Sequence, residues 1–341
     1  MNPAHRCFLL LALSACLAGC DTQPSLSGES VGPESSPESS PESSSESNPE
    51  SSSPSSSGAE TRRLFVASAE LDEISGLQAS RTRPDTWYLH NDDGPAKVFV
   101  MDASGRDLGA FLIEGAANRD WEDISALEHD GRSLLVLADT GDNFAQWDEI
   151  SLYFTPEPQP DKQGHFSGSQ SLYHQINLRY PDGARDCESV AIDPVGGQIL
   201  FLTKRDKPPR LYRIDIETAL SADTAELELL GEAHRFRPPT ANDLQKFGVR
   251  DGQWVSQPTG MDISPDGRWA AVISYRSLYL FEKAQDQDWA DALAGEPIEL
   301  EGPPSLKEEA VGFSRDGDFI LVTTEGLPAP LYRWPMEQIV P

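Results

Sequence analysis

The stretch Arg119-Asp120-Trp121-Glu122-Asp123-Ile124-Ser125-Ala126 decides the fold, because altered copies of it recur along the chain. A second copy reads Arg185-Asp186-Cys187-Glu188-Ser189-Val190-Ala191-Ile192, and looser copies lie at 73–77, 259–263 and 309–313. In each copy an acidic residue, once a Thr, precedes a short apolar strand of small and β-branched residues. A tight turn and a second apolar strand follow. A sequence repeat of this kind indicates an architecture of repeated structural units.

The remaining pattern is that of an all-β protein. From residue 64 onward the apolar runs are short, rich in Val, Ile, Leu, Tyr and Phe, and separated by Asp-Gly, Pro-Asp-Gly and Gly-Gly turns. Many short strands separated by turn residues are typical of all-β folds. A helical period is present only in the short segment 288–294. The strands group into five units of four, except that the fifth unit ends after its third strand.

The missing strand predicts how the fold closes. The segment 63–67 has no partner in its own unit, and it is placed to supply the outer strand of the last one. Joining the two ends of a chain in one sheet closes a propeller and protects its edges. The sequence therefore predicts a single β-propeller of five four-stranded blades. The long intervals 122–188 and 188–259 leave room for a sixth blade. A β-sandwich is disfavoured, since its usual inter-sheet cysteine pair is missing.

The N-terminus predicts export and lipidation. Residues 1–19 resemble a signal peptide, and Leu17-Ala18-Gly19-Cys20 matches the lipobox of bacterial lipoproteins. The alternatives are an ordinary cleaved signal peptide and a membrane span, but the apolar run 8–13 is too short to span a bilayer. A diacylglyceryl group and an amide-linked palmitate on Cys20 would anchor the protein stably to a membrane. We therefore expect a lipoprotein of the bacterial cell envelope, in either the inner or the outer membrane.

The lipidated residue is followed by a segment that is unlike the rest of the chain. Residues 20–60 contain three Pro-Glu-Ser-Ser repeats and a Ser-rich tail, a composition typical of a disordered tether. The propeller domain is then expected at 61–341. Once the signal peptide is removed and Cys20 is lipidated, Cys187 is the remaining thiol, so an internal disulfide is excluded. The formal net charge of −29 argues against nucleic acid as a partner.

The repeat also predicts where a site would lie. In a propeller the innermost strands line a central channel, and the loops before them open on the same face as the loops after the second strands. Four acidic residues are thus expected at one mouth of the channel: Glu73, Glu122, Glu188 and Glu309, with Thr259 in the fifth place. The loops after the second strands bring further polar residues to this mouth, at 90–94, 139–143, 204–206, 275–276 and 324–326.

Crowded carboxylates favour a hard cation such as Ca²⁺, which takes six to eight oxygen ligands. The candidate metal ligands are Glu73, Glu122, Glu188, Glu309, Asp139 and Asp142. The candidates for contacting a small polar or anionic ligand are His90, Asp92, Lys204, Arg205 and Arg276. The alternative is that each Glu caps backbone N–H groups at the start of its blade, or pairs with Arg119 or Arg185.

Four stretches, at 87–94, 118–124, 139–143 and 202–205, resemble a largely uncharacterised group of exported bacterial β-propeller lipoproteins near the phytase-like and esterase-like propellers. The resemblance covers nearly all of residues 64–341. It implies that acidic channel residues hold Ca²⁺ ions against phosphate. The positions here that match this idea are the four Glu of the mouth together with Asp92, Asp139 and Asp142.

Two functions follow from these patterns, and the sequence leaves open whether the protein is an enzyme. The first is a membrane-anchored binding or scaffold module that holds a divalent cation or a small polar ligand at the mouth. The second is a Ca²⁺-dependent hydrolase of phosphoric or carboxylic esters, in which the metal activates water. The chain contains no Gly-x-Ser-x-Gly, His-Glu-x-x-His or glycine-rich phosphate motif, which favours the first.

Overall fold

The computed structural model describes residues 64–302 and 307–340. The predicted signal peptide, the predicted lipidation site Cys20 and the predicted tether lie outside these residues. Within the described part, helices are short, and none combines the length and apolar character needed to cross a membrane.

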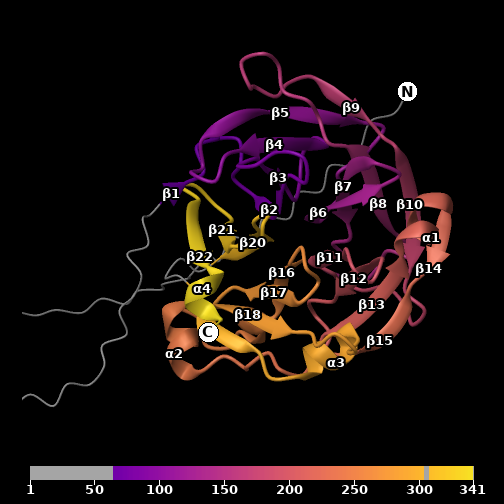
Figure 1. The fold of residues 1–341 in the computed structure, drawn as a ribbon. Coiled ribbons are helices and arrows are strands. Elements are labelled where there is room, and N and C mark those ends of the chain that lie inside the picture. The colour runs from indigo at the N-terminus through magenta and orange to yellow at the C-terminus, as the bar shows by residue number, and fades with distance from the viewer. Residues whose placement is uncertain (1–63, 303–306, 341) are drawn as a thin grey trace, which may run out of the picture. The chain divides into compact units, whose positions relative to one another are not determined.

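Five sheets surround a common centre (Figure 1). Their innermost strands contact one another in a closed ring, in the order β2 (Ile74–Ala79), β6 (Trp121–His129), β11 (Ser189–Asp193), β16 (Pro258–Ile263), β20 (Glu308–Phe313) and again β2. The fold is a five-bladed β-propeller. The prediction of an all-β propeller with five blades rather than six is confirmed.

The blades continue outward in chain order. Blade 1 has β3 (Trp87–Asn91), β4 (Lys97–Met101) and β5 (Asp107–Glu114). Blade 2 has β7 (Arg132–Asp139), β8 (Ile150–Pro156) and β10 (His174–Arg179). Blade 3 has β12 (Gln198–Leu202), β13 (Arg210–Asp215) and β15 (Glu228–Glu232). Blade 4 has β17 (Trp269–Ser274), β18 (Ser277–Glu282) and β19 (Ile298–Glu301). Blade 5 has β21 (Phe319–Thr324) and β22 (Pro330–Pro335).

The N-terminal strand closes the ring as predicted. Strand β1 (Leu64–Phe65) pairs antiparallel with β22, placing Leu64 opposite Leu331 and Phe65 opposite Pro330. The Val66 amide extends this pairing by donating to the carbonyl oxygen of Ala329 at 2.9 Å. Blade 5 is thus completed by the first described segment of the domain, so both ends of the domain are held in one sheet.

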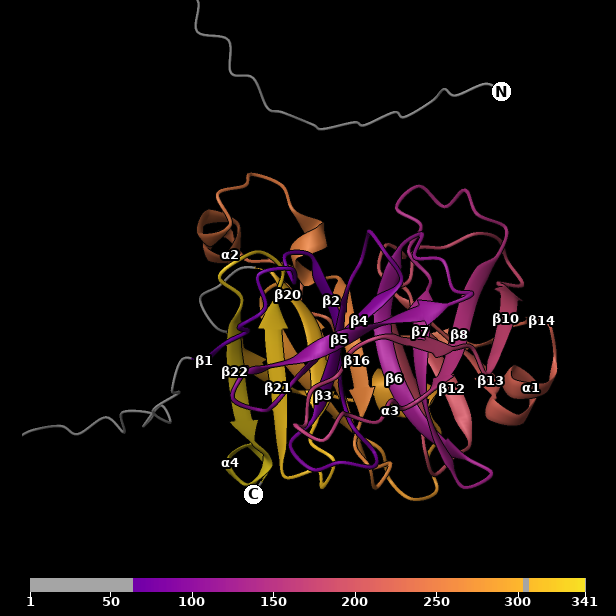
Figure 2. The ribbon, with the colours of Figure 1, turned by 90° about the horizontal axis from the view of Figure 1, so that it is seen from above.

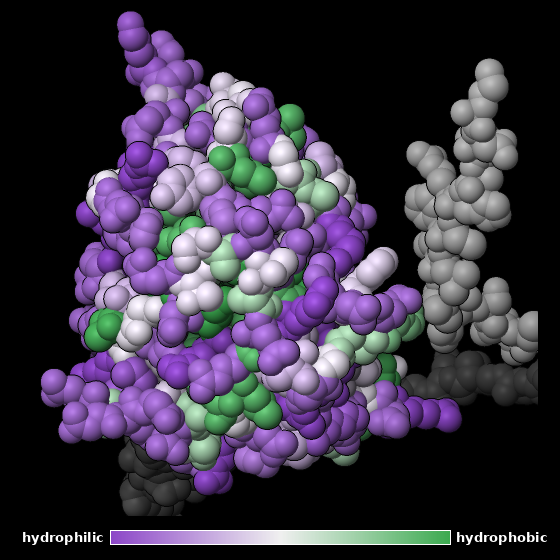
Figure 3. Space-filling model, turned by 90° about the vertical axis from the view of Figure 1, so that its right-hand side faces the viewer, coloured by the Kyte–Doolittle hydropathy of each residue, from purple (hydrophilic) through white to green (hydrophobic). Residues whose placement is uncertain are grey.

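Two sheets are wider than the sequence predicts. Strand β9 (Ser169–Ser171) joins the outer edge of blade 1, and β14 (Thr224–Glu226) joins that of blade 2, each in parallel. Both strands come from chain that belongs to the next blade, so each links two blades and covers an edge that would otherwise expose unpaired backbone groups. Figure 3 shows the side of the propeller formed around β10 and β14 as a largely hydrophilic surface with small, separate hydrophobic patches.

Short helices lie in the connections between strands and, in the case of α4, after the last strand. The predicted segment forms α3 (Trp289–Ala294), and the structure adds α1 (Ile216–Ser221), α2 (Ala241–Lys246), α4 (Met336–Ile339) and the 3₁₀ helix Gln253–Ser256. Each has at most six residues, which is too short for a hydrophobic period to reveal it. Helices α2 and α4 lie at opposite ends of the propeller (Figure 2).

A buried carboxylate joins three blades at the centre. Asp123 Oδ2 accepts hydrogen bonds from the backbone N–H groups of Val190, at 2.9 Å, and Met261, at 3.3 Å, in β11 and β16. Asp262 does the same between blades 4 and 5, accepting from the Phe313 N–H at 2.8 Å. Both aspartates are buried. The innermost strands are therefore held together by side-chain bonds as well as by the apolar clusters between blades.

We predict that Asp123→Ala lowers the free energy of unfolding by about 2–4 kcal/mol, because buried N–H groups in two blades lose their acceptor. Chemical denaturation of the variant measures this. The matched control is Asp286→Ala, at an exposed position, which should change stability by less than about 0.5 kcal/mol. Equal stability of the two variants would contradict the role given to Asp123.

Candidate functional site

Within a blade, the two loops predicted at the mouth lie side by side. The Asp92 amide donates to the Glu73 carbonyl oxygen at 3.0 Å, and the Lys204 amide donates to the Asp186 carbonyl oxygen at 3.0 Å. The same pattern recurs in blade 5, where the Glu325 amide donates to the Lys307 carbonyl oxygen at 3.0 Å. In each case the loop after the second strand is bonded to the loop before the innermost strand. The acidic residues of the repeat lie in or next to the first residues of the innermost strands, beside these loops, and we call this end of the channel the acidic mouth.

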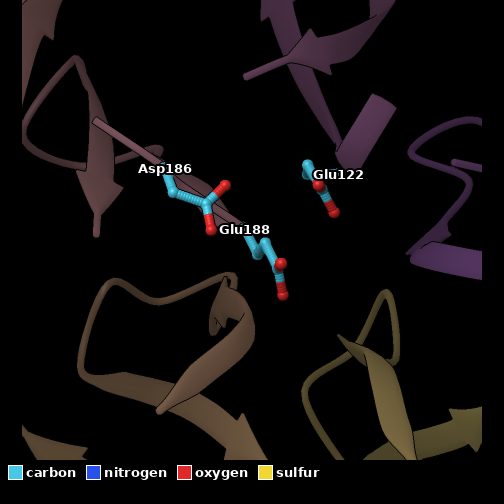
Figure 4. A group of neighbouring side chains, drawn as sticks. All are labelled: Glu122, Asp186 and Glu188. Carbon is cyan, nitrogen blue, oxygen red and sulfur yellow. The ribbon is translucent and has the colours of Figure 1, made fainter. Parts of the chain in front are cut away.

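Three carboxylates of the acidic mouth lie close enough to share one ion. Glu122, Asp186 and Glu188 each offer an oxygen, and these oxygens lie within 4.8 Å of one another. Their residues are 5%, 3% and 4% exposed, respectively. Figure 4 shows the three side chains directed toward a shared space between the loops of blades 2 and 3. This acidic triad could hold a metal ion.

The sequence analysis predicted two members of the triad and missed the third. Asp186 occupies in the second copy of the repeat the place that Asp120 has in the first, two residues before the glutamate. A signal was therefore present, since both clear copies carry Arg-Asp before the glutamate. Asp120 stays near the triad as well, because a Cβ on Gly141 would lie 2.3 Å from Glu122 Oε1 and 2.4 Å from Asp120 Oδ2.

Two cations of the chain already contact the triad. The Lys204 ammonium, itself buried, forms an ion pair with Glu188 and lies 5.1 Å from the centre of the Tyr275 ring. Arg205 Nε lies 2.5 Å from Asp186 Oδ2. On the other side, the Ser75 hydroxyl donates to Glu122 Oε2 at 3.1 Å. These contacts neutralise the triad in part.

Burial raises the pKa values of the carboxyl groups at this end of the channel. Burial, with Glu188 as the next largest cause, raises the pKa of Glu122 well above its usual range. Burial likewise raises the pKa of Glu188 well above that range, although Lys204 opposes the shift. The pKa of Asp120 rises to about 6, mainly through burial and then through the charge of Asp186. Burial and mutual repulsion thus disfavour the charged forms of these carboxyl groups unless a cation lies beside them.

Glu73, Asp92, Glu309 and Glu325 form a second acidic group in blades 1 and 5. A hydrogen bond with Glu325, followed by burial, raises the pKa of Glu73 to about 7. Burial raises the pKa of Asp92 to about 7 and that of Glu309 to about 7. Among the described residues, buried Glu309 Oε2 and Asp92 Oδ1 have no hydrogen-bond partner. Of the four glutamates in the predicted ring, Glu122 and Glu188 are thus in the triad and the other two lie outside it, although the charge of Glu309 still acts on Glu188 and Lys204.

The two predicted aspartate ligands of the 139–143 loop hold backbone groups in place. Asp139 Oδ1 accepts from the Asp120 N–H at 3.0 Å and lies 3.7 Å from Arg119 Nε. Asp142 Oδ2 accepts from the Trp147 N–H at 2.8 Å. The Asp142 N–H in turn donates to Asp186 Oδ1 at 2.9 Å, which orients the triad.

His90 and Arg276, two of the residues predicted to contact a small polar ligand, lie in different surroundings. His90 lies against Gly76 and packs edge-on against Trp121 at 5.6 Å, and burial lowers the pKa of its imidazole to about 4. Arg276 donates to Glu299 Oε1 at 3.0 Å and to the Tyr279 hydroxyl at 2.7 Å, in a buried network of blade 4 separate from the triad.

The two arginines considered as alternative partners of the glutamates pair with other residues. Arg119 faces Asp139 rather than a glutamate of the mouth. Arg185 binds Asp182 and Asp206. Neither arginine forms an ion pair with Glu122 or Glu188, whose described partners are Ser75 and Lys204, respectively.

The donor set of the triad fits a hard divalent cation. Three carboxylates supply oxygen ligands of the kind that Ca²⁺ and Mg²⁺ prefer. Asp186 Oδ2 is buried and has no aligned hydrogen-bond donor among the described residues, in spite of the nearby Arg205. A metal bound here would compete with the charge of Arg205 for this oxygen.

No protein-family model matches the chain, and no curated protein matches it. The family resemblance of the four stretches and the lipobox assignment therefore rest on the sequence motifs alone. What the fold and the triad establish is a five-bladed propeller with an acidic group able to hold a metal ion.

We predict that, in the presence of a chelator, the protein loses thermal stability as the pH rises from about 5 to about 8. Glu73, Asp92 and Glu309, whose pKa values are about 7, keep protons in the folded state that the unfolded state has already released. Stability from these groups is complete below their unfolded pKa values and is lost as the pH passes through about 7.

Thermal unfolding followed by circular dichroism at several pH values measures this loss. The double variant Glu73→Gln, Glu309→Gln should show a shallower decline, whereas Glu226→Gln, at an exposed position, should follow the unmodified protein. A decline that is identical in all three proteins would contradict the assignment to these carboxyl groups.

Proposed function

We propose that the protein binds a divalent cation at the acidic mouth, with Glu122, Asp186 and Glu188 as the ligands. The observation that carries the proposal is the approach of three buried carboxylate oxygens to within 4.8 Å of one another. Buried carboxylates repel each other unless a cation compensates them, so a divalent ion would replace the protons that the groups otherwise hold.

Ca²⁺ is the cation that this setting favours. Ca²⁺ accepts six to eight oxygen ligands in variable geometry, including carbonyl oxygens and water, whereas Mg²⁺ requires a near-octahedral arrangement and retains several waters. Glu122 lies at the start of β6, Asp186 and Glu188 lie just before β11, and Asp120 lies next to the triad as a further oxygen donor. A site with an additional oxygen donor beside it suits the ion that takes more ligands.

Lys204 would oppose the cation and so set the affinity of the site. Its ammonium pairs with Glu188, and it is also influenced by Glu309 and Glu122, which help to raise the pKa of Lys204 in spite of its burial. A divalent ion at the triad would therefore compete with a fixed positive charge. This arrangement favours reversible binding over permanent occupancy.

A binding module is better supported than an ester hydrolase. Metal-assisted hydrolysis needs donor or cationic groups that face the metal and the ester. Of the three cations considered for this role, Arg276 belongs to another network, Arg205 contacts Asp186, and Lys204 pairs with Glu188. No described cation at the triad is without a carboxylate partner.

We predict that Ca²⁺ binds the purified protein at one site in calorimetric titration, and that Asp186→Asn weakens the binding at least about tenfold. Lys204→Met should instead tighten it, because the competing charge is removed. Glu226→Gln serves as the control and should bind as the unmodified protein does. Circular dichroism establishes that each variant is folded.

Two results would overturn the proposal. One is a failure of the unmodified protein to bind Ca²⁺ or Mg²⁺. The other is binding that neither Asp186→Asn nor Lys204→Met changes, since that would place the ion elsewhere. The opposite signs expected for these two variants separate a local effect on the triad from a general loss of stability.

We also propose that the propeller is tethered to a membrane of the bacterial cell envelope through lipidated Cys20. The Leu17-Ala18-Gly19-Cys20 motif and the Ser/Pro/Glu-rich segment that follows support this proposal. A tether of that composition would extend by self-repulsion and place the acidic mouth in the aqueous space beyond the membrane.

Membrane fractionation of cells that produce the full chain tests the anchor. The unmodified protein should sediment with membranes, and Cys20→Ser should lose most of this association because the acyl chains cannot be attached. Cys187→Ser, at a buried position of the propeller, is the matched control and should stay with the membranes. Equal fractionation of all three proteins would exclude Cys20 as the anchor.

A further inference from the structure

A cavity lies at the end of the propeller opposite the acidic mouth, between blades 1 and 5. It has a volume of about 520 Å³ and is lined where β2 turns into β3 and where β20 turns into β21. Ala79 and Trp87 line it from blade 1, and Phe319 and Arg333 line it from blade 5. A volume of this size suits a small molecule.

Three arginines line the cavity, and none forms an ion pair with a described carboxylate. They are Arg83, Arg315 and Arg333. Most other described arginines do form such pairs, for example Arg213 with Glu228 and Arg268 with Glu282. In a chain with a formal net charge of −29, three unpaired guanidinium groups around one cavity require an explanation.

The guanidinium groups of Arg315 and Arg333 are available to a ligand, whereas that of Arg83 is already engaged. Arg83 donates to the Pro158 carbonyl oxygen at 3.1 Å and to the side chain of Gln159, which fixes it on the blade 2 side. Arg333 instead stacks on the Phe319 ring at 3.6 Å, which orients its planar group without using its N–H donors. Arg315 is exposed, and no described group accepts a hydrogen bond from it.

The two aspartates that line the cavity are already engaged by their own turns. Asp85 Oδ1 accepts from the Ala103 N–H at 3.0 Å. Asp316 Oδ1 accepts from the Ser314 hydroxyl at 2.6 Å, and this bond is the main reason that the pKa of Asp316 lies below its usual value. Neither aspartate lies within ion-pair distance of a described arginine, although the charge of Arg333 contributes to the lowered pKa of Asp316, and three arginines outnumber the two aspartates of the lining.

A neighbouring cavity shows that this charge is not a general property of the end of the propeller. A second space, of about 500 Å³, lies between blades 4 and 5 and is lined by Asp266, Trp269, Asp316, Met336 and Glu337 among others. No lysine or arginine lines it. The two cavities flank the same hairpin at Asp316, yet only the first gathers guanidinium groups.

We propose that the cavity between blades 1 and 5 binds a small organic anion, with a carboxylate or phosphate group on a compact apolar body. Guanidinium groups match both anions through paired N–H donors, and Arg315 and Arg333 would supply them. Ala79, Trp87, Phe319 and Ala103 supply the apolar walls. This site is separate from the acidic mouth, so the proposal does not depend on cation binding there.

Calorimetric titration of the full chain with phenyl phosphate, in the presence of a chelator, tests the proposal. We expect one saturable site, with an affinity at least about tenfold higher than those for inorganic phosphate and for benzyl alcohol. Inorganic phosphate has the anionic group without an apolar body, and benzyl alcohol has the apolar body without an anionic group. A separate titration with benzoate distinguishes a carboxylate ligand from a phosphate ligand. Absence of saturable binding of both phenyl phosphate and benzoate would overturn the proposal.

Variants locate the binding. Arg315→Gln with Arg333→Gln should weaken it at least about tenfold, and Ala103→Phe, which fills the cavity while keeping its charge, should weaken it similarly. Arg268→Gln is the matched control, since Arg268 lies over Trp269 in blade 4 but pairs with Glu282. Binding that survives in both cavity variants, or that falls equally in the control, would place the ligand elsewhere and reject the site.

Discussion

The structure depends on closing a ring of five sheets around a narrow centre. The innermost strands must approach closely, so their sequences use small residues, and a Cβ on Gly312 would lie 2.5 Å from the Leu77 carbonyl oxygen of the next blade. Asp123 and Asp262 then bond backbone groups of neighbouring blades. Closure at the outside comes from the pairing of β1 with β22. Each of these constraints fixes one blade relative to the next.

The same constraint produces the chemistry of the acidic mouth. Because each innermost strand starts at the same end of the channel, a carboxylate placed just before that strand is brought near its counterparts from other blades. Neighbouring blades 2 and 3 bring Glu122 and Glu188 together with Asp186. Burial at this narrow end raises the pKa values of the groups and makes positive charge favourable there, which Lys204 and Arg205 supply in part.

Much of this could be predicted from the repeat, since hydrophobic alternation and turn residues specify the strands, and the unpaired first segment specifies closure. The short strands Ser169–Ser171 and Thr224–Glu226 could not be predicted, because they are polar and pair only through their backbones. The division of the four glutamates into two groups depends on side-chain directions that a repeat does not encode. Asp186 was present in the pattern, in the Arg-Asp pair that precedes the glutamate in both clear copies of the repeat.

The central claim is that the carboxyl groups of the acidic mouth exchange protons for a divalent cation. The most direct measurement is proton release when CaCl₂ is added to the protein in weakly buffered solution at about pH 6.5 and at about pH 8.5. Burial raises the pKa values of Glu122 and Glu188 well above their usual range, so an ion bound at the triad should displace protons from them. Ca²⁺ binding without proton release at either pH would contradict the claim.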